Sequence, residues 1–149
     1  MKDIYDLVKE HEAKLEEFIE WQIDQDHGLT NDFHSFAEAN VQVEDLFKHA
    51  AILYPKFVLI ESQVVLSDHY SKDNWDNWRK SRDARSTANI VNHVHVEDYL
   101  SKDYKGTVKL SDGLGDLLVF FWSMAVKQQY PNHNINVEYD GDVINIINA

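Results

Sequence analysis

The chain has 149 residues, of which 44% are apolar and 12% aromatic, and this composition is typical of a folded domain rather than a disordered segment. Its formal net charge of −12 argues against binding to the phosphates of nucleic acids or to anionic membranes. The same charge favours a basic protein as partner, although acidic surfaces also serve solubility alone. The absence of cysteine excludes disulfides, thiolate metal sites and cysteine nucleophiles.

Residues 1–6 are charged where a secretory signal would need an apolar core. The longest apolar run, Leu117 to Trp122, is too short to span a bilayer. We therefore expect a cytoplasmic protein without membrane contact, folded as a single domain over residues 1–149.

The first predicted element is a helix over residues 2–25, because apolar side chains recur there at spacings of three and four. Residues 1–26 hold nine acidic residues and three lysines. Their net charge of −6 is half of the total of −12. Six of the acids fall within an arc of roughly 100° on one continuous helix, and Trp21 lies beside it. This arc is the candidate partner-binding face, with Trp21 as a candidate anchor of the contact. Its acids are Asp3, Asp6, Glu10, Glu17, Glu20 and Asp24.

Further elements follow from the same periodicities. A second helix is expected from Thr30 or Asn31 to Tyr54, ended by Pro55. Residues 56–60 and 64–66 read as strand, with residues 61–63 forming either a turn or a polar interruption of one long strand. The rest is expected as a helix over 73–90, a segment 91–100 that fits either strand or helix, and a short strand 107–110.

The last third of the chain gives the clearest local signals. The most apolar helix is expected to begin at Ser111 or Asp112 and to end before Pro131. Asp140-Gly141 predicts a two-residue hairpin turn. In that register Tyr139 pairs with Asp142, Val137 with Ile144 and Ile135 with Ile146. The last two pairs place four apolar side chains on one shared face. The element order predicts an α+β fold, with helices packed on a small, mainly antiparallel sheet that includes a C-terminal β-hairpin.

No phosphate-binding, nucleophile or zinc-protease motif is present in the sequence. Gly113-Leu114-Gly115 resembles half of a dinucleotide fingerprint, but flexible entry into a helix explains it better. His93 and His95 are the best metal candidates, with Asp98 or His69 as a third ligand, although structural histidines are more common at such spacings. They define one alternative function, a metal-dependent enzyme. A second alternative is a structural or regulatory protein.

The stretch from Trp75 to Arg85 mixes tryptophans with cations, a pattern that also occurs in proteins that bind single-stranded nucleic acid. A structural interpretation is preferred because helical spacing predicts a Trp75–Arg79 cation–π pair and the ion pairs Asp76–Lys80 and Arg79–Asp83. We expect no nucleic acid, metal or cofactor to bind.

In its size, its acidity, its lack of cysteine and its lack of catalytic motifs, the chain resembles the immunity proteins of contact-dependent inhibition and other bacterial polymorphic-toxin systems. The resemblance is compositional and rests on no family signature. It implies a non-catalytic protein that neutralises a basic toxin domain, often a nuclease, by presenting carboxylates to its lysines and arginines. The oligomeric state does not follow from the sequence.

Overall fold

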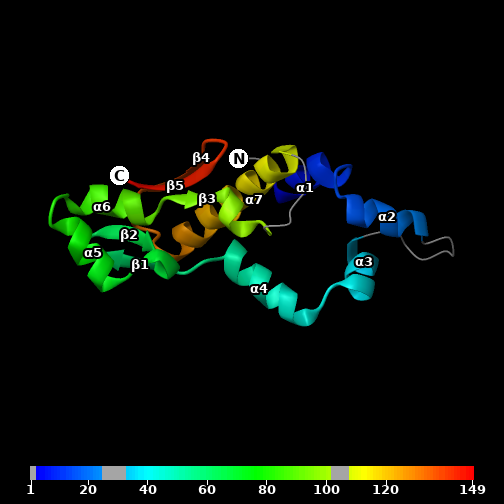
Figure 1. Cartoon of the computed structure of the whole chain (residues 1–149), viewed down its shortest axis with the longest axis horizontal. Coiled ribbons are helices and arrows are strands. Elements are labelled where there is room, and N and C mark those ends of the chain that lie inside the picture. Colours follow the sequence, from blue (N-terminus) through cyan, green and yellow to red (C-terminus); the bar gives the residue numbers. More distant parts are fainter. Residues whose placement is uncertain (1–2, 25–32, 102–107) are drawn as a thin grey trace. The chain divides into compact units, whose positions relative to one another are not determined.

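The computed structural model describes residues 3–24, 33–101 and 108–149 and confirms the α+β class (Figure 1). The chain separates into two compact units, Met1–Ile52 (unit 1) and Leu53–Ala149 (unit 2). Each unit is considered by itself below, and the single domain expected over residues 1–149 stays a prediction. Among the described residues, no helix has both the length and the apolarity needed to cross a bilayer.

Unit 1 is helical in its described residues, and the single helix predicted over residues 2–25 is wrong. Two helices are found instead, α1 (Ile4–Glu12) and α2 (Glu16–Asp24). The Nδ1 atom of His11 lies 2.9 Å from the Leu7 carbonyl oxygen, and Lys14 N–H donates back to the carbonyl of His11, which tightens the last turn. Glu16 and Glu17 then favour a new N-terminus, because carboxylates stabilise the positive end of the helix dipole.

The second predicted helix is also divided, into α3 (Phe33–Asn40) and α4 (Val43–Leu53). The Asn40 side chain donates to a carbonyl four residues earlier at 2.9 Å, a local bond that competes with the helix ladder. Glu44 and Asp45 start α4 with acids in its first turn. The predicted start at residues 30–31 lies outside the described residues, whereas the predicted end before Pro55 is confirmed.

Unit 2 opens with a hairpin of β1 (Phe57–Ile60) and β2 (Gln63–Leu66), which decides the open alternative in favour of a turn. Glu61 and Ser62 occupy that turn with φ of 46° and 64°, as both central positions of a type I′ turn require. The Glu61 carboxylate accepts hydrogen bonds from Trp75 Nε1 at 3.1 Å and from Arg79 Nε at 3.0 Å. These bonds hold a residue without glycine's freedom in the left-handed region.

The helix predicted over residues 73–90 is likewise two helices, α5 (Lys72–Arg79) and α6 (Ala84–Val91). Asp83 breaks it because its carboxylate accepts from the Ser86 N–H at 2.7 Å and caps α6. The three side-chain pairs predicted in this stretch do not form direct contacts, although the charge of Arg79 still contributes to lowering the pKa of Asp83, after hydrogen bonds from Ser86. Lys72 pairs with Asp76 and Arg79 with Glu61, while the Arg82 guanidinium lies 4.8 Å from the Trp78 ring centre.

Segment 91–100 contains both kinds of structure, the short strand β3 (Val94–His95) and the 3₁₀ helix η2 (Val96–Tyr99). The strand expected over residues 107–110 is wrong for residues 108–110, which open helix α7 (Val108–Gln129); residue 107 lies outside the described residues. A strand needs a partner to satisfy its backbone, whereas a helix satisfies its own. The predicted end of this helix before Pro131 is confirmed.

The C-terminal hairpin is confirmed, but its predicted register is wrong by two residues. Strands β4 (Ile135–Tyr139) and β5 (Val143–Asn148) pair Tyr139 with Ile144 and Val137 with Ile146. The turn is centred one residue later than predicted, because the Asp140 carboxylate accepts from the N–H groups of residues 142 and 143, and Gly141 takes a φ of 103°. A shift of two keeps each side chain on its predicted face.

Helix α7 packs against the three-stranded sheet β3-β5-β4 (Figure 1). Trp122 and Leu118 on α7 and Ile144 and Ile146 on β5 are at most 1% exposed, so the helix predicted to be the most apolar lines the core of this unit. A second core forms between β2, α5 and α6 around Trp75.

Two buried asparagines connect the two sheets of unit 2. The side-chain amide of Asn148 on β5 receives the Val64 N–H at 2.7 Å and donates to the Val64 carbonyl at 3.1 Å. Asn92, which caps the end of α6, receives the Leu66 N–H and donates to the Val64 carbonyl, both at 2.9 Å. The free edge of β2 is therefore bonded through side chains rather than through a neighbouring strand.

Gly115 in α7 is required by a close contact with Tyr139 on β4. A Cβ at this position would lie 2.5 Å from ring carbons of Tyr139, whose hydroxyl donates to Asp112 at 3.1 Å. Burial and this carboxylate raise the pKa of Tyr139 to about 12. The close contact thus explains Gly115, whereas the flexible helix entry expected at residues 113–115 is wrong, because these residues lie inside α7.

We expect Gly115→Ala to lower the free energy of unfolding by about 1 kcal/mol or more, since overpacking typically costs about 1–3 kcal/mol. In an open helix position the same change gains about 1 kcal/mol. Urea denaturation of the variant measures this. In a Tyr139→Ala background the substitution should become neutral or stabilising, and an equal loss in both backgrounds would contradict the packing explanation.

Candidate functional site

The six acidic residues predicted to bind a partner are all exposed, but they do not form one continuous face. The predicted arc assumed one continuous helix. Because the chain breaks between α1 and α2, three of the acids belong to α1 and three to α2. Asp3 caps α1, accepting from the Tyr5 N–H at 3.0 Å, and Asp6 and Glu10 follow on that helix. Glu17, Glu20 and Asp24 lie on one face of α2 at spacings of three and four.

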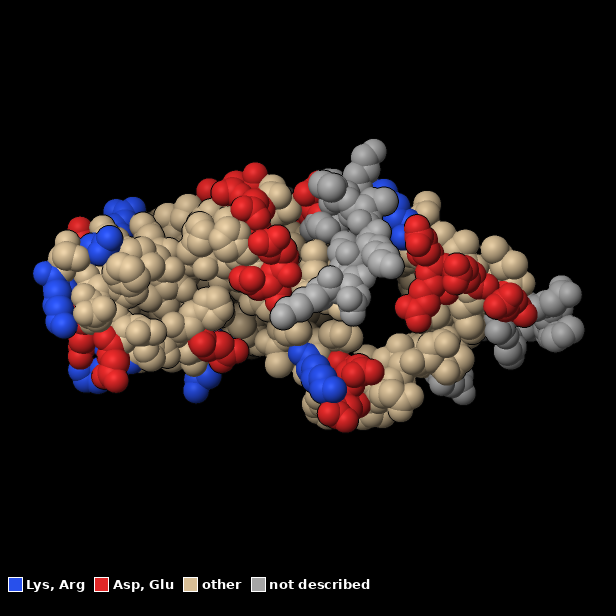
Figure 2. Space-filling view, viewed as in Figure 1, with Lys and Arg blue, Asp and Glu red and all other residues tan. Residues whose placement is uncertain are grey.

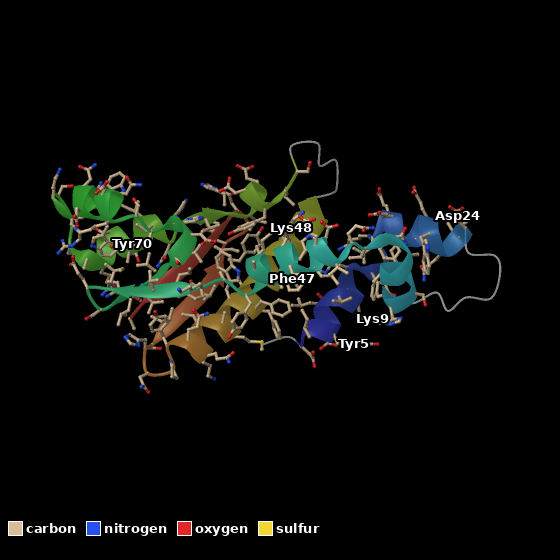
Figure 3. The ribbon with its side chains drawn as sticks, turned by 90° about the horizontal axis from the view of Figure 1, so that it is seen from below. Tyr5, Lys9, Asp24, Phe47, Lys48 and Tyr70 are labelled. Carbon is tan, nitrogen blue, oxygen red and sulfur yellow. The ribbon has the colours of Figure 1, made fainter. Side chains whose placement is uncertain are left out.

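Acidic side chains gather over α2 in Figure 2, and Figure 3 shows Asp24 close to the end of that helix. Two of the three described lysines of unit 1 are engaged with other acids. Lys9 pairs with Glu12 at 2.6 Å, and Lys48 on α4 pairs with Glu44 at 3.1 Å. Neither pair involves an acid of α2, so these two lysines do not neutralise the acids of that helix.

Trp21 is half-buried and belongs to an aromatic cluster of α2 and α3. Its ring stacks on Phe18 with centres 6.1 Å apart and meets Phe36 edge-on at 5.5 Å, while Phe18 contacts Phe33 at 4.4 Å. The predicted role of Trp21 as an anchor stays a prediction, and only the part of the ring outside this cluster is open to a partner.

Ile23 is an apolar residue of the α2 surface that the sequence did not single out. It is 74% exposed and lies three residues after Glu20, while Trp21 lies four residues after Glu17. The acidic strip of α2 is thus flanked by apolar side chains on both sides. No signal of this exposure is present in the sequence, because Ile23 follows Ile19 by four residues, a spacing that predicts a shared apolar face.

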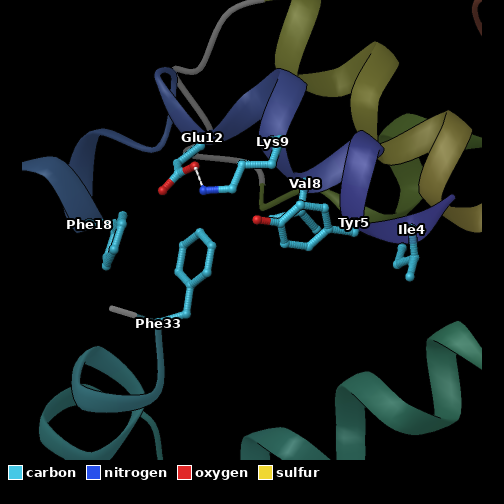
Figure 4. A pocket seen from close by; sticks show the side chains of 7 residues that line it. All are labelled: Ile4, Tyr5, Val8, Lys9, Glu12, Phe18 and Phe33. Atoms are coloured by element: carbon cyan, nitrogen blue, oxygen red, sulfur yellow. Dashed lines mark hydrogen bonds and ion pairs between the residues drawn. The ribbon is translucent and has the colours of Figure 1, made fainter. Parts of the chain in front are cut away.

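A cavity of about 450 Å³ lies within unit 1, between α1, the start of α2 and the start of α3 (Figure 4). Its walls are mainly apolar and aromatic, and the Lys9–Glu12 ion pair is its charged group. At about 100° per residue this side of α1 is opposite Asp6 and Glu10. The cavity is lined by Ile4, Tyr5, Val8, Lys9, Glu12, Phe18 and Phe33.

The predicted histidine pair is brought together, with ring centres of His93 and His95 4.9 Å apart. His95 Nδ1 lies 3.3 Å from the Asp142 carboxylate, while His69 Nδ1 lies 3.3 Å from the Val91 carbonyl oxygen. Within residues 3–24, 33–101 and 108–149, no three His, Asp or Glu side chains are placed to hold a metal ion.

No protein-family model, curated protein or solved structure matches this chain. Its function is therefore argued from its own residues.

The hydrogen bond from His95 to Asp142 raises the pKa of the imidazole, with the negative charge of the carboxylate adding to the effect. A raised pKa means that the charged pair contributes stability below the ordinary histidine value of about 6.5, and that this contribution is lost as pH rises through the raised value.

We expect Asp142→Asn to lower the titration midpoint of His95, which can be measured by NMR. Asp98→Asn, which removes only a more weakly coupled charge, should lower it less, and an equal shift in both variants would contradict this assignment.

Proposed function

We propose that this chain is a non-catalytic binding protein that neutralises a basic protein partner through unit 1. The observation that carries the proposal is the distribution of charge between the two units. Residues 1–52 contain 13 acidic and 4 basic side chains, a net charge of −9, whereas residues 53–149 contain 13 and 10, a net charge of −3. The field of unit 1 would attract and orient a cationic surface.

Exposed apolar side chains supply the second requirement of a binding surface. In unit 1, Ile23 is 74% exposed, Phe47 75% and Val43 69%. Figure 3 shows Phe47 beside Lys48 on α4. Binding energy at protein interfaces concentrates in buried apolar and aromatic contacts, while charges at the rim mainly set the association rate. Unit 1 offers both.

The partner we propose is a basic toxin domain, with this chain as its immunity protein. A nuclease is the toxin class that fits best, because its active surface carries lysines and arginines that normally meet phosphate. Carboxylates on α1 and α2 would occupy those cations. Such neutralisation requires neither a cofactor nor turnover, which agrees with the absence of catalytic motifs from the sequence.

The experiment begins with the full chain as bait, followed by mass spectrometry of what it captures and expression of the basic candidate. Association rates with that partner are then measured at two ionic strengths. We expect the double variant Glu17→Lys, Glu20→Lys to associate about tenfold or more slowly at low salt and to show a flatter salt dependence.

The matched control is Glu97→Lys, Asp98→Lys. It makes the same change in net charge at two exposed acids of η2 in unit 2, so its association rate should stay near that of the parent. If the Glu17→Lys, Glu20→Lys variant associates as fast as the parent at low salt, the acids of α2 do not steer the partner.

A further inference from the structure

The cavity of unit 1 has the composition of a binding pocket. Its volume of about 450 Å³ falls within the range of roughly 300–1,000 Å³ that ligand pockets occupy. Ile4 and Val8 form the aliphatic wall, and Phe18 and Phe33 form the aromatic wall (Figure 4). Pockets of this kind take an apolar group and fix its orientation with few polar contacts.

The aromatic residues at the cavity are left open to different degrees. Phe18 is only 4% exposed, but Phe33 is 38% and Tyr5 65% exposed. An aromatic ring placed between them would cover both and would find ring edges and faces to contact. The open aromatic surface therefore favours an aromatic occupant.

The rim of the cavity already accommodates an ammonium group. Lys9 Nζ lies 2.6 Å from a Glu12 carboxylate oxygen and 5.7 Å from the centre of the Tyr5 ring. The carboxylate raises the pKa of Lys9, as expected for an ammonium held by an anion. The Lys9 side chain is 49% exposed and can turn away, so a second cation could share Glu12.

We infer that this cavity receives an aromatic side chain of the basic partner, flanked in the partner by Lys or Arg. The inference rests on the proposed function and adds an anchor to it. Charge complementarity identifies the occupant, since unit 1 has a net charge of −9 and Glu12 lies at the cavity rim. Because the cavity is on the side of α1 opposite Asp6 and Glu10, anchoring and steering are separate contributions.

The test uses two blocked peptides, Lys-Phe-Lys and Lys-Ala-Lys, with Glu-Phe-Glu as the charge-reversed probe. Binding to the full chain is followed by amide chemical shifts in NMR. We expect Lys-Phe-Lys to bind about tenfold more tightly than Lys-Ala-Lys, with shifts at Val8, Lys9 and Phe33. Glu-Phe-Glu should not bind.

Two cavity variants and one charge variant separate the contributions. Val8→Phe fills the cavity, and Phe33→Ala removes one wall. In each variant the affinity for Lys-Phe-Lys should fall nearly to that for Lys-Ala-Lys. Two changes are made so that a folding defect in one leaves the other informative. The double variant Glu17→Lys, Glu20→Lys should weaken both lysine peptides by the same factor and preserve the preference.

Equal affinity of the two lysine peptides for the parent chain would overturn the anchor while leaving the proposed function standing. Shifts centred on the exposed Phe47 of α4 would also overturn it. Binding of Glu-Phe-Glu would contradict the charge complementarity. Failure of the proposed function would appear elsewhere, as unchanged association rates of the charge variant with the isolated partner.

Discussion

The structure of unit 2 depends on hydrogen bonds between side-chain amides and the edge of β2. A two-stranded hairpin leaves outward-facing N–H and C=O groups, and burying them without partners would cost about 1–3 kcal/mol each. Asn148 meets Val64 as a neighbouring strand would, with one bond accepted and one donated. Asn92 bonds to Leu66 and also reaches the Ile146 carbonyl at 3.4 Å, so two small sheets share one buried edge.

A third amide extends the same principle to the start of the hairpin. The Gln129 side chain at the end of α7 accepts from the Phe57 N–H and donates to the Pro55 carbonyl, both at 2.9 Å. The Tyr130 hydroxyl donates to the Phe57 carbonyl at 3.1 Å. These bonds connect β1 to the helix that covers the other sheet. The three amides explain how two separate small sheets form one folded unit. The proposed binding function depends on other residues, the acidic and exposed apolar side chains of unit 1.

Much of the architecture could be predicted from local patterns. Pro55 and Pro131 ended helices where expected, and the alternation in β4 and β5 placed the correct side chains inside. The helix breaks were missed for two different reasons. Asp83 and Asn40 were readable signals, a cap and a competing amide. The break after α1 contains neither proline nor glycine, and a periodicity argument does not detect it.

The hairpin register and the candidate site show that local patterns do not predict specific side-chain contacts. Dipeptide preference favoured Asp140-Gly141 as the turn, but hydrogen bonds that the Asp140 carboxylate accepts from two backbone N–H groups moved the turn by one position. Exposure of the acids followed from the amphipathic pattern, whereas the cluster around Trp21 depends on Phe36 from another helix. The function of Asn92 and Asn148 was invisible because each amide binds backbone far away in the sequence.

Hydrogen exchange tests the role of these amides most directly. On an unpaired edge of a two-stranded hairpin, the N–H groups of Val64 and Leu66 would exchange by local fluctuation. The account predicts that in the full chain both N–H groups exchange as slowly as the most protected amides of α7, through global unfolding only. Exchange of Val64 and Leu66 at the rate of the exposed turn residue Ser62 would show that Asn92 and Asn148 do not hold the two sheets together.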